Sequence, residues 1–155
     1  MATIFVLVDH CTAECLALHA ARCGTRFEAI ECLRQAVRYR LSDYEPRIAR
    51  GVVLRHDHGP QFVAHAYQEE LRFLGITSSP TYVREPEGNG CAERFIRTLK
   101  EQLLWLTRFE TIDELNGALR AFRERYNAQW LIERHGYRSP SEHYRRLTEG
   151  MPRAA

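Results

Sequence analysis

Two acidic residues, Asp57 and Glu93, have the surroundings expected of a pair of metal-binding carboxylates. Asp57 follows the apolar run 52–54, and the carboxyl end of a strand is where open α/β sheets place their ligands. Glu93 lies in the first turn of an expected helix, one and two turns before Arg97 and Lys100. Each acid alone also fits a structural role, as a turn former or as the partner of a surface ion pair. The informative feature is the pair, which is separated by the 35 residues 58–92.

Extended motifs surround both acids. The first is Asp57-His58-Gly59-Pro60-Gln61-Phe62, and the second is Pro86-Glu87-Gly88-Asn89-Gly90-Cys91-Ala92-Glu93. Two further motifs follow, Tyr126-Asn127 and Gly136-Tyr137-Arg138-Ser139-Pro140. In this combination the chain resembles the integrase core (DDE) domain of insertion-sequence transposases, which are relatives of the retroviral integrases. The resemblance implies an α/β, RNase H-like fold in which a mixed sheet is flanked by helices.

The resemblance also implies an activity, which is DNA transposition by Mg²⁺-dependent (or Mn²⁺-dependent) phosphoryl transfer. Asp57 and Glu93 would be catalytic metal ligands, because these cations prefer hard oxygen donors. Lys100, Arg97 and Arg94 would contact DNA phosphates, which gives binding that is independent of sequence and sensitive to salt. The implied partners are transposon ends, target DNA and further copies of the protein. We expect a cytoplasmic location and no association with a membrane.

The family needs three acids, and Asp9 is the candidate for the first by its position after the apolar run 4–8. The strand count favours another interpretation, because only two strands fit before residue 25 whereas an RNase H-like domain has three. Residues 4–20 then resemble the second and third strands of the family, and the first core strand is expected to be missing. On this hypothesis the chain is amino-terminally truncated and inactive alone. The alternative function is a non-catalytic fragment that binds nucleic acid or oligomerises.

Periodicity and turn residues predict the order of the elements, with Thr25 as the N-cap of one helix and Gly75 at the end of the next. Strands are expected at 3–9, 15–20 and 52–54 (the last one buried) and from 76; helices are expected at 25–39, 62–74, 91–107 and 111–126, with a last helical turn at 140–147. The 91–107 helix should place Leu106 on its core face. We expect an integrase catalytic core over 1–126 and a carboxy-terminal tail of the transposase core over 127–155.

Length and composition limit the remaining function classes. The chain has 155 residues, which suits one domain, and its 22 basic and 20 acidic residues leave a net charge of only +2. No apolar run approaches the roughly 20 residues that span a bilayer. The spacing of the five cysteines fits neither a disulfide framework nor a zinc finger, which indicates a reducing compartment. We expect these cysteines to be small buried residues. A phosphohydrolase built on His56-Asp57 is disfavoured because this pair follows a strand-like segment; both His56 and His58 are expected at the surface.

Overall fold

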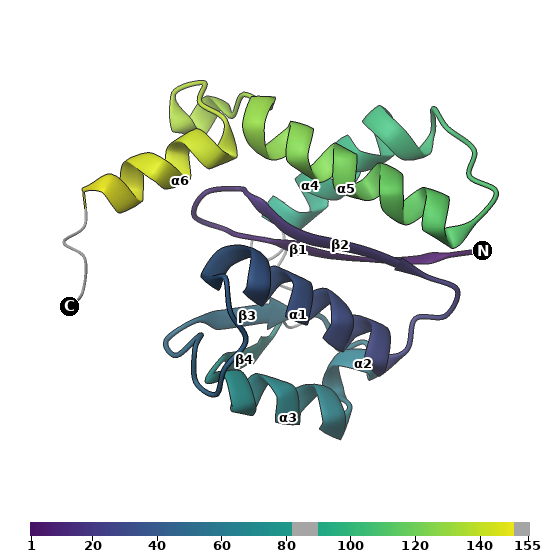
Figure 1. The fold of residues 1–155 in the computed structure, drawn as a ribbon, viewed down its shortest axis with the longest axis vertical. Helices are drawn as coiled ribbons and strands as arrows, with labels where there is room; N and C mark the ends of the chain where they lie inside the picture. Colours follow the sequence, from purple (N-terminus) through teal and green to yellow (C-terminus); the bar gives the residue numbers. More distant parts are fainter. Residues whose placement is uncertain (82–89, 151–155) are drawn as a thin grey trace.

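The computed structural model describes residues 1–81 and 90–150, in which strands and helices alternate (Figure 1). The strands are β1 (Thr3–Val8), β2 (Cys15–Ala21), β3 (Val53–His56) and β4 (Thr77–Pro80). The helices are α1 (Arg26–Leu41), α2 (Pro60–Val63), α3 (His65–Leu74), α4 (Gly90–Leu99), α5 (Ile112–Gln129) and α6 (Pro140–Glu149). A π-helical segment η2 (Lys100–Leu104) continues α4, and a short 3₁₀ helix η3 (Glu133–His135) precedes α6. This order confirms the predicted α/β class.

Strands β1 and β2 form an antiparallel hairpin between two helical layers (Figure 1). Side chains alternate along β1: Phe5 packs in the core cluster built on α1 and α3, whereas Ile4 and Val6 pack in the cluster built on α4 and α5. Helix α1 begins after Thr25, whose side chain accepts a hydrogen bond from the N–H of Glu28 at 3.4 Å, as the sequence predicts for this N-cap. The hairpin is therefore covered by helices on both faces.

Strands β3 and β4 form a second, parallel pair, connected by α2 and α3. Gly75 ends α3 with a φ of +77°, a left-handed conformation that favours glycine. The prediction of a buried strand at 52–54 is wrong, because Val52 and Val53 are 48% and 57% exposed. In the described part of the chain β3 pairs only with β4, so the start of β3 lies at a sheet edge and keeps its contact with solvent.

Two asparagines of α5 cover the outer edge of β2. The amide of Asn116 accepts a hydrogen bond from the N–H of Ala20 at 2.8 Å and donates one to its C=O at 2.9 Å. Asn127 makes the same two bonds with Cys15, both at 2.8 Å. Each side chain thus takes the place of a neighbouring strand, which satisfies backbone groups that an uncovered edge would leave unpaired.

Helix α4 changes its geometry after Leu99. Its α-helical part buries Phe95 and Leu99, and from Lys100 the chain continues as a π-helix that ends at Leu104. Leu103 and Leu104 pack against the core, whereas Leu106 lies beyond the end of the helical segment and is 73% exposed. The prediction of an uninterrupted helix to residue 107 with Leu106 on its core face is therefore wrong.

The carboxy-terminal residues pack back on the amino-terminal hairpin. Helix α5 runs past residue 126 to Gln129, so the expected boundary between core and tail falls inside one helix. The hydroxyl of Ser141 donates to the buried carboxylate of Glu14 at 3.1 Å, and the Arg40 guanidinium lies 3.9 Å from the centre of the Tyr144 ring. Across 1–81 and 90–150, no helix combines the length and the apolar character needed to cross a membrane.

Candidate active site

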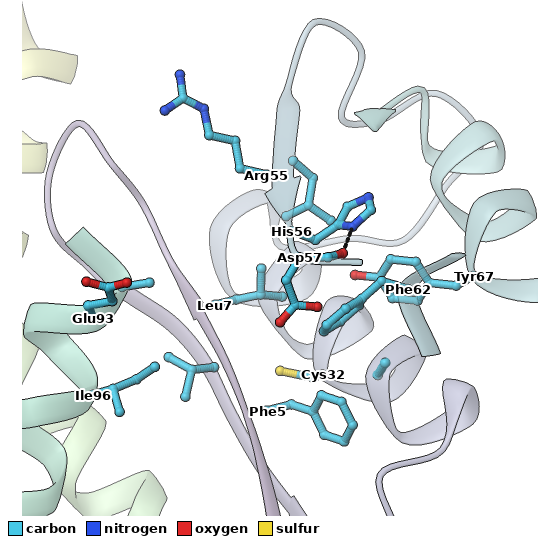
Figure 2. A pocket seen from close by; sticks show the side chains of 14 residues that line it. Phe5, Leu7, Cys32, Arg55, His56, Asp57, Phe62, Tyr67, Glu93 and Ile96 are labelled. Atoms are coloured by element: carbon cyan, nitrogen blue, oxygen red, sulfur yellow. Dashed lines mark hydrogen bonds between the residues drawn. The ribbon is translucent and has the colours of Figure 1, made fainter. Parts of the chain in front are cut away.

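Both predicted metal ligands, Asp57 and Glu93, line one pocket of about 330 Å³. Figure 2 shows them reaching it from different elements: Asp57 follows β3, and Glu93 projects from α4. Further lining side chains come from β1, α1, β3 and α4, and they include Phe5, Leu7, Cys32, Leu54, Arg55 and Ile96. In the view of Figure 2 the two carboxylates do not touch, and each lies on its own side of the pocket.

The position of Asp57 depends on Gly59. The N–H of Gly59 donates to Oδ1 of Asp57 at 2.7 Å, which turns the carboxylate back toward its own backbone. A Cβ atom on residue 59 would lie only 2.8 Å from that oxygen and 2.6 Å from Nε2 of Gln61. A side chain at residue 59 would therefore displace the carboxylate of Asp57 or the amide of Gln61 from its present position.

His56 is buried, which corrects the expectation of a surface histidine. Its Nδ1 lies 2.7 Å from the C=O of Asp57, a group that can only accept, so Nδ1 carries the proton (Figure 2). Its Nε2 is then left to accept from the hydroxyl of Ser78 at 2.8 Å. Because β4 supplies Ser78, this histidine connects the backbone of Asp57 to the neighbouring strand and fixes the end of β3.

The basic residues that the resemblance assigns to DNA lie on one exposed helical segment. Arg94, Arg97 and Lys100 are all exposed, and Lys100 lies at the junction where the helix widens. None of the three is among the described residues that line the pocket, so they flank it along α4 rather than enter it. Their exposure leaves them available to phosphates, and their role on DNA stays a prediction.

Asp9, the candidate for the first acid, is held in the turn of the hairpin. Its Oδ1 accepts from the N–H of Cys11 at 2.9 Å, and its Oδ2 accepts from the hydroxyl of Thr12 at 2.9 Å and from Arg40 at 3.1 Å. The described residues that line the pocket include Asp57 and Glu93 but not Asp9. The structure therefore gives Asp9 a turn-forming role and does not bring it to the other two acids.

Arg55 lines the pocket and was missed by the sequence analysis. The motif residues Pro86, Glu87, Gly88 and Asn89 lie outside the described residues.

The pocket also contains a thiol, but not a reactive one. Burial raises the pKa of Cys32 to about 12, so the thiolate that a nucleophile requires is not populated at neutral pH. Cys15 is buried as well, with its pKa raised by burial, whereas Cys11 and Cys23 are exposed. The expectation of small buried cysteines thus holds for two of the five, with Cys91 intermediate.

Comparisons with known proteins agree with this arrangement. Residues 74–140 match the family model described as an integrase core domain. The chain is 31% identical over 93 residues to the transposase for insertion sequence element IS904 of Lactococcus lactis subsp. lactis (strain IL1403), covering 59% of this chain and 37% of that protein. It is 33% identical over 90 residues to the putative transposase InsD for insertion element IS2E of Escherichia coli (strain K12), covering 57% and 41%. The match thus spans about two fifths of each relative's length.

Solved structures show the same fold. The catalytic core domain of BIV integrase superposes with a TM-score of 0.71 at 23% identity, covering 96% of this chain and 88% of that one. The HTLV-2 integrase catalytic core domain in complex with magnesium superposes with a TM-score of 0.65 at 18% identity, covering 91% and 83%. The fold is therefore RNase H-like, as in these integrase cores, and within it residues 74–140 resemble the integrase core family.

Proposed function

We propose that the chain is the part of a transposase core that acts in DNA transposition, with Asp57 and Glu93 as two of its ligands for Mg²⁺ or Mn²⁺. The observation that carries the proposal is that two acids with 35 residues between them in the sequence line one pocket. Hard carboxylate oxygens suit these cations, and Asp57 keeps Oδ2 outside its hydrogen bond with Gly59. When bound, a pair of such cations stabilises the attacking and the leaving oxygens of a phosphoryl transfer.

The residues around the acids have separate tasks in this proposal. His56 and Gly59 position Asp57, the first through its backbone and the second through its carboxylate. Arg97 and Lys100 lie along α4 beyond Glu93, where they would hold the phosphates of a DNA strand whose scissile bond lies at the pocket. The transposases that resemble this chain support DNA as a partner, and the HTLV-2 integrase core, described in a trimeric form, supports further copies as partners.

A site with two acids binds a pair of cations weakly, so we propose that the chain alone lacks strand-transfer activity. The described residues hold no group of three His, Cys, Asp or Glu side chains that could bind one metal ion. The test is a strand-transfer and nicking assay on labelled DNA with Mg²⁺ or Mn²⁺. We expect no product from the wild-type chain, and robust product that is abolished by Asp9→Asn would contradict the assignment of Asp9 to the turn.

The second candidate function is that of a non-catalytic DNA-binding fragment. It is favoured because, among the described residues that line the pocket, Asp57 and Glu93 have no third acid beside them. DNA binding measured by fluorescence anisotropy at increasing salt separates the two candidates. For the non-catalytic fragment, we expect binding to weaken with salt and in Lys100→Ala. Divalent cations and Asp57→Asn should leave that binding unchanged. Binding that divalent cations strengthen, and that loses this response in Asp57→Asn, supports the metal site. Arg72→Ala is the matched control, because it also removes one exposed positive charge, on α3.

A further inference from the structure

Gln68, on α3, uses its side-chain amide to contact two neighbouring segments. Its Nε2 donates to the C=O of Phe62 in α2 at 2.8 Å and to the hydroxyl of Ser78 in β4 at 3.3 Å. A carbonyl oxygen can only accept, so the contact with Phe62 requires the nitrogen of this amide, and not its oxygen, on that side. Both partners are in turn connected to the turn that contains Asp57.

The contact with Ser78 continues as a chain of hydrogen bonds to the backbone of Asp57. Because the oxygen of Ser78 accepts from Gln68, its hydroxyl hydrogen is directed to Nε2 of His56, at 2.8 Å. The Nδ1 of His56 then donates to the C=O of Asp57 at 2.7 Å (Figure 2). All the donors point the same way, from Gln68 to Asp57, so each bond polarises and strengthens the next.

The contact with Phe62 leads to the same turn from its other end. The N–H of Phe62 donates to the C=O of Gly59 at 2.9 Å, in the first turn of α2. The N–H of Gly59 donates to Oδ1 of Asp57 at 2.7 Å. One amide, that of Gln68, therefore holds the segment 57–62 at both ends.

Water has little access to the middle of this chain. His56 is buried, and the centroids of the Phe62 and Tyr67 rings lie 5.6 and 6.4 Å from that of its imidazole. Gln68 and Ser78 are half-buried. A buried group that loses its partner is costly to leave unpaired, so each bond of the chain depends on the one before it.

We propose that Gln68 is a positioning residue for the candidate metal site, and that its amide sets the orientation of the Asp57 carboxylate through His56 and Phe62. Neither Gln68 nor Ser78 is among the described residues that line the pocket, so both act on it through other residues. Partners that hold a metal ligand in place change metal affinity by about 10–100-fold. This part of the inference rests on the proposed function, because it takes Asp57 as a ligand.

The variant Gln68→Glu tests the direction of the chain, because a carboxylate keeps the shape of the amide but cannot donate. The hydroxyl of Ser78 should then donate to the new carboxylate instead of to His56. We expect NMR of the imidazole nitrogens to show that His56 leaves the tautomer with its proton on Nδ1, and the N–H of Gly59 to exchange faster. Mn²⁺ should bind about tenfold more weakly. An added negative charge alone would strengthen cation binding, so charge does not explain this result.

Two variants of Ser78 test the chain at its second residue. Ser78→Ala removes the donor to His56 and should have the same effects on the imidazole and on Mn²⁺ affinity. Ser78→Thr keeps the hydroxyl and should retain the wild-type values. Ser79→Ala is the matched control, because it makes the same change one residue further along β4, outside the chain of hydrogen bonds.

The readouts without metal separate this inference from the proposed function. Unchanged His56 and Gly59 signals in Gln68→Glu, or equal effects of Ser78→Ala and Ser79→Ala, would overturn the positioning role. The role is also overturned if these signals change and Mn²⁺ affinity does not, while Asp57→Asn lowers that affinity. If wild type and Asp57→Asn bind Mn²⁺ equally and the signals change as expected, the proposed function is wrong, and the control of the Asp57 turn by Gln68 is supported.

Discussion

The side-chain amide of Asn127 is hydrogen-bonded to both backbone groups of Cys15, a residue 112 positions earlier in the chain, at 2.8 Å each. The last helical turn of α5 is thereby attached to the first residue of β2. Asn116 repeats the arrangement with Ala20 near the other end of the strand. The Tyr126-Asn127 motif thus has a structural explanation, since it seals a sheet edge.

Replacing Asn127 by alanine should destabilise the fold more than replacing Asn116. The Asn127 variant leaves the N–H and C=O of Cys15 buried without partners, which costs about 2–4 kcal/mol of unfolding free energy. Asn116 is only half-buried, so water can replace part of its bonds. Urea denaturation of both variants measures the difference. An equal loss in the two variants would contradict the explanation by burial.

Asp9 and Asp57 should respond to substitution in opposite ways. Asp9→Asn weakens the hydrogen bonds to Thr12 and Arg40 and should lower the unfolding free energy by about 1–2 kcal/mol, with Mn²⁺ affinity unchanged. Asp57→Asn removes a proposed ligand and should reduce Mn²⁺ affinity while leaving stability within about 0.5 kcal/mol. Calorimetric titration of Mn²⁺ and urea denaturation provide the two readouts. Loss of Mn²⁺ binding in Asp9→Asn would place Asp9 in the metal site.

A methyl group at residue 59 should affect the metal site more than the fold. In Gly59→Ala the new Cβ displaces Oδ1 of Asp57, so we expect about tenfold weaker Mn²⁺ binding. Unfolding free energy should change by less than about 1 kcal/mol, because Gln61 can move its flexible side chain. Gly90→Ala is the matched control, since its Cβ would meet nothing within 4 Å. Equal effects of the two substitutions on Mn²⁺ binding would refute the role of Gly59.

Stability should fall in mild acid because of His135. Burial lowers the pKa of this imidazole below 6.5, and the nearby His143 and Arg134 lower it further. The unfolded chain therefore binds a proton at a pH where the folded chain does not, so stability is lost as the pH falls below about 6.5. The contribution of one such proton is at most about 1.4 kcal/mol per pH unit.

The check is urea denaturation of the wild-type chain and of His135→Gln between pH 5 and pH 8. The variant should show a shallower loss of unfolding free energy below pH 6.5, since residue 135 no longer titrates. The ring of His135 lies parallel to that of His143 with centroids 3.9 Å apart, so stability at pH 8 is the reference for the lost stacking. Parallel pH profiles for the two proteins would show that another group is responsible.

Local patterns were sufficient to predict much of this fold. The N-cap at Thr25 and the glycine that ends α3 depend on neighbours within a few residues, and both are confirmed. The π-helical segment could not be predicted, because apolar spacing over 91–107 fits a continuous helix. Leu106 was misplaced because the helical segment ends at Leu104 and leaves Leu106 beyond it, where it is 73% exposed.

The candidate site was predicted less completely than the fold. Motif spacing predicted Asp57 and Glu93 as a pair, and the two residues line one pocket; their role as metal ligands and the exclusion of Asp9 stay predictions. The burial of His56 was missed because it depends on Ser78 and on the rings of Phe62 and Tyr67, which only the folded chain brings near.

The central claim, that Asp57 and Glu93 bind the same divalent cations, is tested most directly by Fe²⁺-catalysed cleavage of the backbone in the native chain. Iron bound in place of Mg²⁺ should cut the chain beside residue 57 and beside residue 93 with the same concentration dependence. Both cuts should disappear in Asp57→Asn and persist in Asp9→Asn. A cut at residue 93 that remains in Asp57→Asn, or cutting at only one of the two segments, would contradict the account.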